Sequence, residues 1–247
     1  MSERLKSNLP SPLILADFSD GSWYATSFAM QFLYREKSSV SILQTYQNLS
    51  MGHFMMRKLS HQLKKITKYE LKALKNKLLT NFRIEKHEVN TLSVEGELNF
   101  IINYKPLING PHNIVLCTYS SFGDSCNRQN GCLEKIVDTS DHPLFILPET
   151  FEGETSKNIL FVGNPEKNPS EQLYNQVLEI CKRTQSKLEI LFVGKKQEAL
   201  ETVKSFYHEH AKGIDITVRT IRNNSKCKGI KKYLKSTDKD LIVIAND

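Results

Sequence analysis

Five cysteines and seven histidines are the side chains of this 247-residue chain best suited to metal binding or nucleophilic chemistry. The cysteines are scattered and form no C-x-x-C pair, so their spacing indicates neither a zinc ribbon nor a disulfide framework. Cys126 and Cys132, with His112 and His142, match no metal-ligand pattern. In His208-Glu209-His210, which is predicted to be helical, the two imidazoles diverge around the helix axis. We expect reduced, structural thiols and no metal site.

Motifs that carry enzymatic chemistry are also missing from the sequence. There is no Walker loop of the G-x4-G-K-[ST] type and no G-x-S-x-G nucleophile elbow. No histidine is spaced from a nucleophile as in a recognised catalytic motif. We therefore expect a protein that is not an enzyme.

Asp17 follows the first apolar run, Leu13–Ala16, and begins a polar turn over residues 17–22. A side chain at the carboxyl end of a buried parallel strand lies where such sheets bind ligands. The same position suits an aspartate that accepts hydrogen bonds from free N–H groups of the turn that follows it. Ligand binding and local capping are both open for Asp17.

The apolar pattern predicts one strand–helix unit written twice, the second time without its last helix and strand. In the first copy we expect strands at 13–16, 40–46, 82–89, 113–118 and 143–147, and helices at 22–35, 59–78, 98–102 and 133–139. The strand at 82–89 is the least apolar, which is typical of a sheet edge. The long helix is expected to expose a basic face and to bury Leu59, Leu63, Ile66, Ala73, Leu74 and Leu78.

The second copy is predicted to have strands at 158–162, 188–193, 214–220 and 240–245, and helices at 169–183, 196–212 and 225–235. This alternation predicts an α/β fold with a parallel sheet covered by helices on both faces. We expect two doubly wound, Rossmann-like domains in tandem: residues 1–149, a linker at 150–156, and residues 157–247. Without a fifth strand in its own copy, the strand at 240–245 would leave an open edge. We expect a strand of the first copy or of a second chain to cover it.

The order of elements, Asp17 after the first strand, and the Val94-Glu95-Gly96 turn before the third helix resemble the universal stress protein family. The resemblance spans essentially the whole chain as a tandem pair. It implies an adenine nucleotide alpha hydrolase-like fold with strand order 3-2-1-4-5. Members of the family are non-enzymatic or weakly hydrolytic, and they divide into those that bind ATP and those that do not.

The ATP-binding members carry a loop of the form G-x2-G-x9-G-[ST] after the fourth strand, and an acidic residue after the first. The resemblance places Asp17 at the acidic position, Thr118 and Ser121 at the early glycines, and Gly131-Cys132 at the final pair. Asn130-Gly131 is an alternative register for that pair. Side chains at 118 and 121 oppose the close approach of backbone N–H groups to phosphate that glycine allows. The resemblance thus implies a degenerate site without a cofactor, with ATP or AMP binding at these positions as the alternative.

In the second copy the first strand ends in Val162-Gly163-Asn164, which lacks the acidic residue. This copy is expected to serve as scaffold or partner surface.

The net charge of +7 is concentrated in two segments. Residues 57–77 carry eight Lys and Arg against Glu70, and residues 219–239 carry eight against Asp238. Both segments predict solvated helix faces, with a polyanion-binding module as the alternative. The sequence shows no helix-turn-helix, zinc finger or aromatic platform that would favour nucleic acid.

The expected function is that of a universal-stress-protein-like, non-enzymatic stress-response protein that acts through dimerisation and protein contacts. The chain would be a homodimer or an intramolecular pseudo-dimer, with an unknown protein partner. An ATP or AMP sensor and the polyanion-binding module are the alternatives. No apolar run reaches membrane-spanning length and the first ten residues have no apolar signal core, so we expect a cytoplasmic protein without membrane contact.

Overall fold

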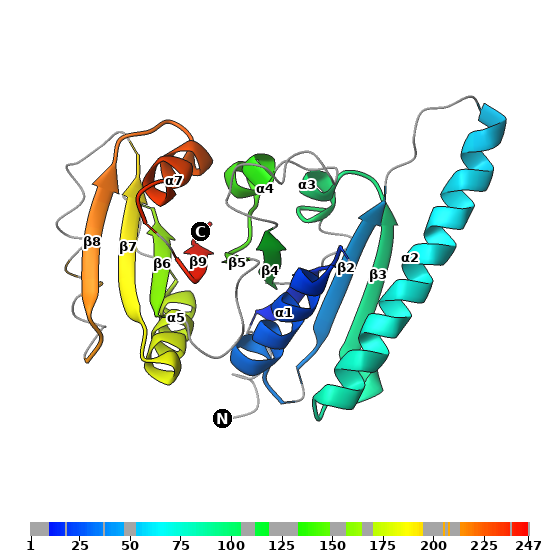
Figure 1. The fold of residues 1–247 in the computed structure, drawn as a ribbon, viewed down its shortest axis with the longest axis horizontal. Helices are drawn as coiled ribbons and strands as arrows, with labels where there is room; N and C mark the ends of the chain where they lie inside the picture. Colours follow the sequence, from blue (N-terminus) through cyan, green and yellow to red (C-terminus); the bar gives the residue numbers. More distant parts are fainter. Residues whose placement is uncertain are drawn as a thin grey trace.

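A computed structural model gives the fold (Figure 1). It describes residues 10–17, 19–36, 38–46, 53–104, 112–118, 133–148, 157–164, 170–194, 205, 207, 213–237 and 239–246. We call residues 10–148 the first half and residues 157–246 the second half. Across the described residues, no helix combines the length and hydropathy that a transmembrane span requires.

The first half contains five strands and the helices that connect them. Its elements are β1 (Ser11–Leu15), α1 (Asp20–Phe28), the π-helical η2 (Ala29–Leu33), β2 (Val40–Tyr46), α2 (His53–Asn81), the 3-10 turn η3 (Lys86–Glu88), β3 (Val89–Glu95), α3 (Leu98–Ile101), β4 (His112–Thr118), α4 (Leu133–Thr139) and β5 (Leu144–Pro148). The elements described in the second half are β6 (Asn158–Gly163), α5 (Glu171–Thr184), β7 (Lys187–Val193), β8 (Ile216–Ile221), α7 (Lys226–Leu234) and β9 (Leu241–Ile244). Of the helix expected at 196–212, the structure describes Ser205 and Tyr207, both helical.

All nine described strands form one sheet in the order β3-β2-β1-β4-β5-β9-β6-β7-β8. The order 3-2-1-4-5 expected for the first half is confirmed, as is the α/β class with a mostly parallel sheet. Within each half the neighbouring strands are parallel. The halves meet where β5 and β9 pair antiparallel, with Leu144 opposite Ile244 and Ile146 opposite Ile242. β5 is thus the strand that covers the edge expected to be open at 240–245.

Two hydrophobic layers, one on each face of the sheet, continue across this junction. Phe145 of β5 and Val243 of β9 belong to the layer covered by α1, α2 and α5. Ile146 and Ile242 belong to the opposite layer, which contains side chains of α3, α4 and α7. Because successive side chains of a strand point to opposite faces, β5 and β9 at the junction carry apolar side chains toward both layers.

Polar contacts join the halves outside the sheet. On one face, Arg35 forms an ion pair of 2.8 Å with Glu179 of α5, and the Arg183 guanidinium donates to the Gln31 carbonyl oxygen at 2.8 Å. On the other face, Asp138 of α4 accepts hydrogen bonds at the start of α7. Its donors are the Ser225 hydroxyl at 2.9 Å and the Cys227 N–H at 3.2 Å.

The strand expected at 82–89 is wrong. Helix α2 continues to Asn81, a 3-10 turn occupies 86–88, and β3 begins at Val89. Phe82 and Ile84 are apolar because they pack against the hydrophobic layer from a connecting segment. β3 does lie at the sheet edge, and its Asn90 and Thr91 are exposed, so its apolar signal is weak.

The Val94-Glu95-Gly96 segment is also divided differently from the expected turn. Val94 and Glu95 are the last residues of β3, and Gly96 alone makes the turn, with φ of 139°. That φ is open to glycine and strained for other residues.

The burial expected for α2 is wrong at two positions. Thr67, Leu71 and Leu78 are buried, whereas the Ile66 side chain is 54% exposed and Ala73 is exposed. Ile66 precedes Thr67 by one residue, which turns it about 100° around the helix axis and away from the sheet. The expected domain boundaries stay a prediction, and the expected linker at 150–156 lies outside the described residues.

Candidate functional site

The candidate ligand position lies at the carboxyl ends of β1 and β4. β2 pairs with one side of β1, and β4 pairs with the other side. The strand order therefore changes direction at β1, which makes the space between the ends of β1 and β4 the topological switch point of the sheet. Doubly wound sheets bind ligands at such switch points. Asp17, which is half-buried, stands two residues beyond the end of β1.

Within its own turn, the Asp17 carboxylate is a capping group. Its Oδ1 accepts hydrogen bonds from the Ser19 N–H at 3.0 Å, from the Ser19 hydroxyl at 2.5 Å, and from the Ser22 hydroxyl. The Asp17 N–H donates to the Ser22 hydroxyl oxygen at 2.8 Å. Ser19 in turn caps α1, since its hydroxyl accepts from the Ser22 N–H at 3.3 Å. The local role considered for Asp17 is therefore present in the structure.

The other expected site residues can be placed only in part. Thr118 is the last residue of β4, where its backbone is in register with Pro148 of β5, and nothing is described of its side chain. Ser121, Gly131 and Cys132 lie outside the described residues. The β1–β4 register, with Ile14 opposite Val115, places the end of β4 beside the turn that holds Asp17. The ends of β1 and β4, which carry the expected site residues Asp17 and Thr118, therefore lie side by side.

In the tandem arrangement that the sequence predicts, the corresponding position in the second half is the end of β6, where Gly163 and Asn164 stand in place of an acidic residue. Gly163 is required for packing. A β-carbon there would lie 2.6 Å from the Tyr207 hydroxyl oxygen and 2.9 Å from the nearest Phe192 ring carbon. Tyr174, whose hydroxyl donates to the Tyr207 carbonyl oxygen at 2.9 Å, completes an aromatic cluster with Phe161. This end of the second half is filled by core side chains.

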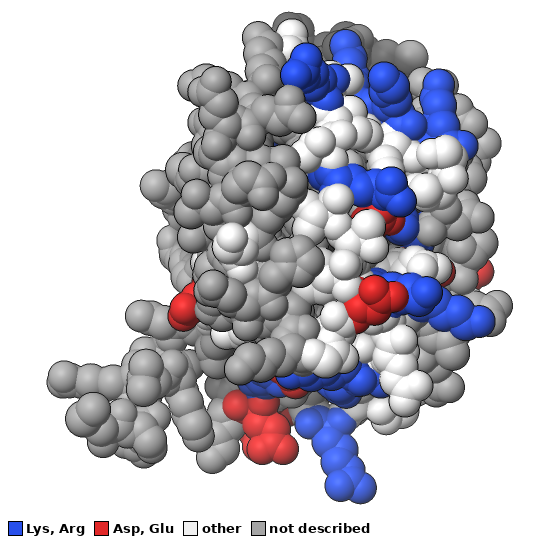
Figure 2. Space-filling model, turned by 90° about the vertical axis from the view of Figure 1, so that its left-hand side faces the viewer, with Lys and Arg blue, Asp and Glu red and all other residues white. Residues whose placement is uncertain are grey.

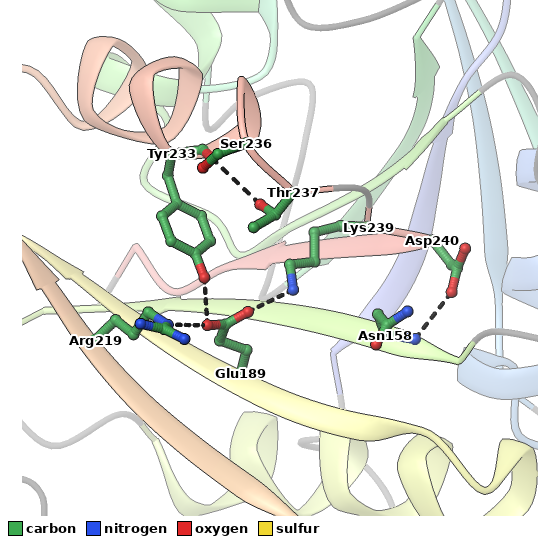
Figure 3. A network of polar contacts seen from close by, with 8 residues as sticks. All are labelled: Asn158, Glu189, Arg219, Tyr233, Ser236, Thr237, Lys239 and Asp240. Atoms are coloured by element: carbon green, nitrogen blue, oxygen red, sulfur yellow. Dashed lines mark hydrogen bonds and ion pairs between the residues drawn. The ribbon is translucent and has the colours of Figure 1, made fainter.

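A second polar constellation, which sequence reasoning missed, surrounds Glu189 of β7 (Figure 3). Glu189 Oε1 accepts from Arg219 Nε of β8 at 2.6 Å and from the Tyr233 hydroxyl of α7. Its Oε2 accepts from the ammonium of Lys239, which precedes β9. The Glu189 and Lys239 side chains are 13% and 8% exposed, so this ion pair is largely removed from water. We call these four residues the Glu189 network.

Charge and burial set the protonation states of this network. Burial alone would raise the pKa of Glu189, but the hydrogen bonds from Lys239, Tyr233 and Arg219 outweigh it, and the pKa lies below its usual value. Burial and the adjacent Glu189 raise the pKa of Tyr233 to about 12. A carboxylate held ionised by three donors is a poor general base. The network is suited to hold β7, β8, α7 and the entry to β9 together.

The structure describes the side chains of two cysteines, Cys181 and Cys227, and the expectation of reduced thiols stays a prediction. Both are buried and neither is in a disulfide, and burial raises the pKa of Cys181 to about 12. Such a thiol is a poor nucleophile at neutral pH. Among the described residues, no group of three or more His, Cys, Asp or Glu side chains is placed to hold a metal ion. Cys126, His208 and His210 lie outside them.

Both basic segments form exposed surfaces. Figure 2 shows the left-hand side of Figure 1, where Lys and Arg side chains gather toward the upper end, the end at which α7 lies. There Lys228, Lys232 and Lys235 are exposed on or next to α7. On α2, at the opposite end of the sheet, Lys64, Lys65, Lys68 and Lys72 are exposed.

The sequence matches no protein-family model and no curated protein. The fold, in contrast, is similar to solved structures. A universal stress protein from Archaeoglobus fulgidus superimposes with a TM-score of 0.53 at 11% identity, covering 96% of both chains. A putative universal stress protein from Pseudomonas aeruginosa gives 0.48 at 12% identity, covering 97% of this chain and 94% of its own. The cytoplasmic domain of a prokaryotic cation chloride cotransporter gives a TM-score of 0.49 at 9% sequence identity, covering 96% of this chain and 95% of its own. This chain therefore has a universal-stress-protein-like fold, and at such identities the likeness extends to the fold alone.

Proposed function

We propose that this chain is a non-enzymatic, universal-stress-protein-like module of the cytoplasmic stress response that acts through protein contacts, with a degenerate nucleotide position. The observation that carries the proposal is the engagement of Asp17. Its Oδ1 accepts three hydrogen bonds from Ser19 and Ser22, so the acidic residue already has a structural task in the turn that holds Ser19, the N-cap of α1. A side chain retained for capping needs no ligand to explain it.

We propose further that the two halves are tandem copies that pair within one chain. The antiparallel β5–β9 pairing supports this, as do the two continuous hydrophobic layers. A pair formed internally needs no second chain to complete its sheet. Light scattering of the purified chain should then give the mass of a monomer, whereas a stable dimer at micromolar concentration would favour the homodimer.

A nucleotide sensor is the second candidate, and one observation favours it. Asp17 is half-buried at the switch point, and its Oδ2 accepts no hydrogen bond from the described residues. That oxygen has lone pairs for a ribose hydroxyl or an amino group of a nucleotide.

Calorimetric titration with ATP and Mg²⁺ separates the two candidates. Under the degenerate-site proposal the titration gives no saturable heat up to millimolar nucleotide, and the thermal midpoint stays unchanged. A functional site filled to 100 times its Kd would stabilise the fold by about 2.7 kcal/mol.

Two variants assign any binding that is observed. Asp17→Asn keeps an acceptor oxygen for the Ser19 and Ser22 donors but removes the charge, whereas Ser22→Ala removes one of these donors and keeps the carboxylate. Micromolar binding that Asp17→Asn abolishes and Ser22→Ala retains would establish the sensor and refute the degenerate site.

A further inference from the structure

The outward side of α2 carries an unusual combination of side chains. We define the α2 outer face as Lys64, Lys65, Ile66, Lys68, Tyr69 and Lys72. These side chains are all exposed, with Ile66 at 54% and Tyr69 at 76%. Figure 1 shows α2 beside β3 at one end of the molecule, with its upper part projecting beyond the strands. The face is accessible to a large, flat partner.

The four lysines of this face have no carboxylate partner among the described residues. Other cations of the same helix do have contacts: the Lys75 ammonium donates to the Lys86 carbonyl oxygen at 2.9 Å, and Lys77 lies 3.9 Å from the Trp23 ring centroid. Lys64, Lys68 and Lys72 follow one another at four-residue intervals. Like charges at this interval destabilise a helix, so the lysines do not serve helix stability.

The two apolar side chains of the face lie among these lysines instead of against the sheet. Tyrosine is enriched where a bilayer meets water, because its ring is apolar and its hydroxyl polar. A helix that lies on a membrane combines lysines, which approach anionic headgroups, with apolar side chains that enter the headgroup and acyl boundary. The α2 outer face has both components.

We propose that the α2 outer face binds the surface of an anionic lipid bilayer. Lys64, Lys65, Lys68 and Lys72 approach the headgroup phosphates, while Tyr69 and Ile66 insert between the headgroups. Two observations favour lipid over nucleic acid. The face contains no arginine, the residue that recognises nucleic-acid phosphates in a bidentate fashion, and of its two apolar side chains only Tyr69 has a ring on which a base could stack, so the face lacks a platform for successive bases.

The exposed basic face of α7 provides a matched control. Lys228, Lys232 and Lys235 are also exposed and without a described carboxylate partner. The large apolar side chains that are exposed in the described residues are Ile66, Tyr69, Phe100 and Tyr104, and none of them lies on α7. Electrostatic attraction to an anionic bilayer would act on both basic faces, whereas insertion into the bilayer requires the exposed apolar side chains that only the α2 outer face has of these two.

The test is sedimentation of the full chain with vesicles of phosphatidylcholine, pure or with 30% phosphatidylserine. We expect binding to the anionic vesicles that weakens as NaCl rises from 50 to 500 mM. Each lysine near such a surface raises partitioning roughly fivefold, so replacing all four α2 lysines by glutamine should lower it roughly 10²- to 10³-fold. The double variant Ile66→Ser, Tyr69→Ser should bind the anionic vesicles more weakly at every salt concentration. The α7 triple variant, Lys228→Gln, Lys232→Gln and Lys235→Gln, should retain most of the vesicle binding.

Three results would overturn the proposal. The first is failure of the unmodified chain to sediment with anionic vesicles at 50 mM NaCl, a result that needs no variant. Loss of binding in the α7 variant to the same extent as in the α2 variant would show unspecific attraction. Binding of a fluorescent single-stranded oligonucleotide that depends on the α2 lysines, with no vesicle binding, would assign the face to nucleic acid.

Discussion

Replacing Glu189 by glutamine removes the single carboxylate of the Glu189 network while preserving the size of the side chain. Lys239, 8% exposed, is then left buried without a carboxylate partner. Breaking a buried ion pair from one side costs 3–5 kcal/mol, and the glutamine oxygen still accepts one hydrogen bond, so we expect a loss of about 3 kcal/mol in the free energy of unfolding. For a chain of this length the thermal midpoint should fall by roughly 6–12 °C.

The assay is urea unfolding followed by far-UV circular dichroism and by the fluorescence of Trp23, the sole tryptophan. Trp23 lies in α1 of the first half, and Glu189 in the second. Because the hydrophobic layers continue across the β5–β9 junction, both probes should shift together in Glu189→Gln. A shift in circular dichroism with no change in the Trp23 transition would show that the halves unfold independently.

A double-mutant cycle with Lys239→Met tests the cause of this loss. The double variant Glu189→Gln with Lys239→Met should be markedly less destabilised than the sum of the two single variants, because no buried charge is left without a partner; Arg219, 59% exposed, stays in contact with water. Arg219→Ala is the control: its side chain is 59% exposed, and its removal should have a much smaller effect. Additive effects of Glu189→Gln and Lys239→Met would refute the reasoning.

The same network makes a prediction about pH. Since the folded-state pKa of Glu189 is lowered, its stabilisation is fully present above the ordinary value of 4.5 and is lost as pH falls through the folded-state pKa. This part of the acid destabilisation should be missing from Glu189→Gln.

Three further predictions concern packing, titration and capping. Gly229→Ala should lower the free energy of unfolding, measured in urea, by about 1–2 kcal/mol. The new β-carbon would lie 2.4 Å from a Val193 methyl, and the cost of this overpacking exceeds the gain in helix propensity. Adding Val193→Ala should restore part of the lost stability. The pKa of His142 is lowered, mainly by burial and also by the nearby His112, so the free energy of unfolding should fall as pH drops below 6.5. In thermal melts recorded at several pH values, His142→Gln should show a weaker dependence on pH. Ser19→Ala should cost about 1 kcal/mol in thermal unfolding; an unchanged midpoint would contradict the capping geometry.

The order of the fold could be predicted because central strands and amphipathic helices have strong local patterns. Residues 13–15 of β1 form a continuous apolar run that is buried on both faces, and the helix over Glu171–Thr184 repeats its apolar residues at helical spacing. β3 was misplaced because an edge strand buries few side chains and Phe82, just before it, is apolar for another reason. Ile66 is exposed although it is apolar, because the buried side of α2 at this point is formed by Thr67 and Leu71, and Ile66 lies about 100° around the helix axis from Thr67.

The candidate site was less accessible to sequence reasoning. Asp17 could be found because its position depends on a local strand-to-turn signal, and both of its expected roles follow from that turn. The Glu189 network could not, because Glu189 is 30 residues from Arg219 and 50 from Lys239. Such contacts depend on strand register and on how α7 lies over the sheet, and no local pattern encodes either.

The antiparallel junction also has a consequence for how the chain folds. Leu144 of β5 and its partner Ile244 of β9 are 100 residues apart in the sequence, although they meet in the interior of the sheet. Contacts of such high sequence separation slow folding, because loop closure must precede their stabilisation. Until β9 docks, β5 presents an unpaired edge that can accept the β9 of another molecule. We therefore expect slow refolding whose yield falls as protein concentration rises, with strand-exchanged dimers as the characteristic by-product.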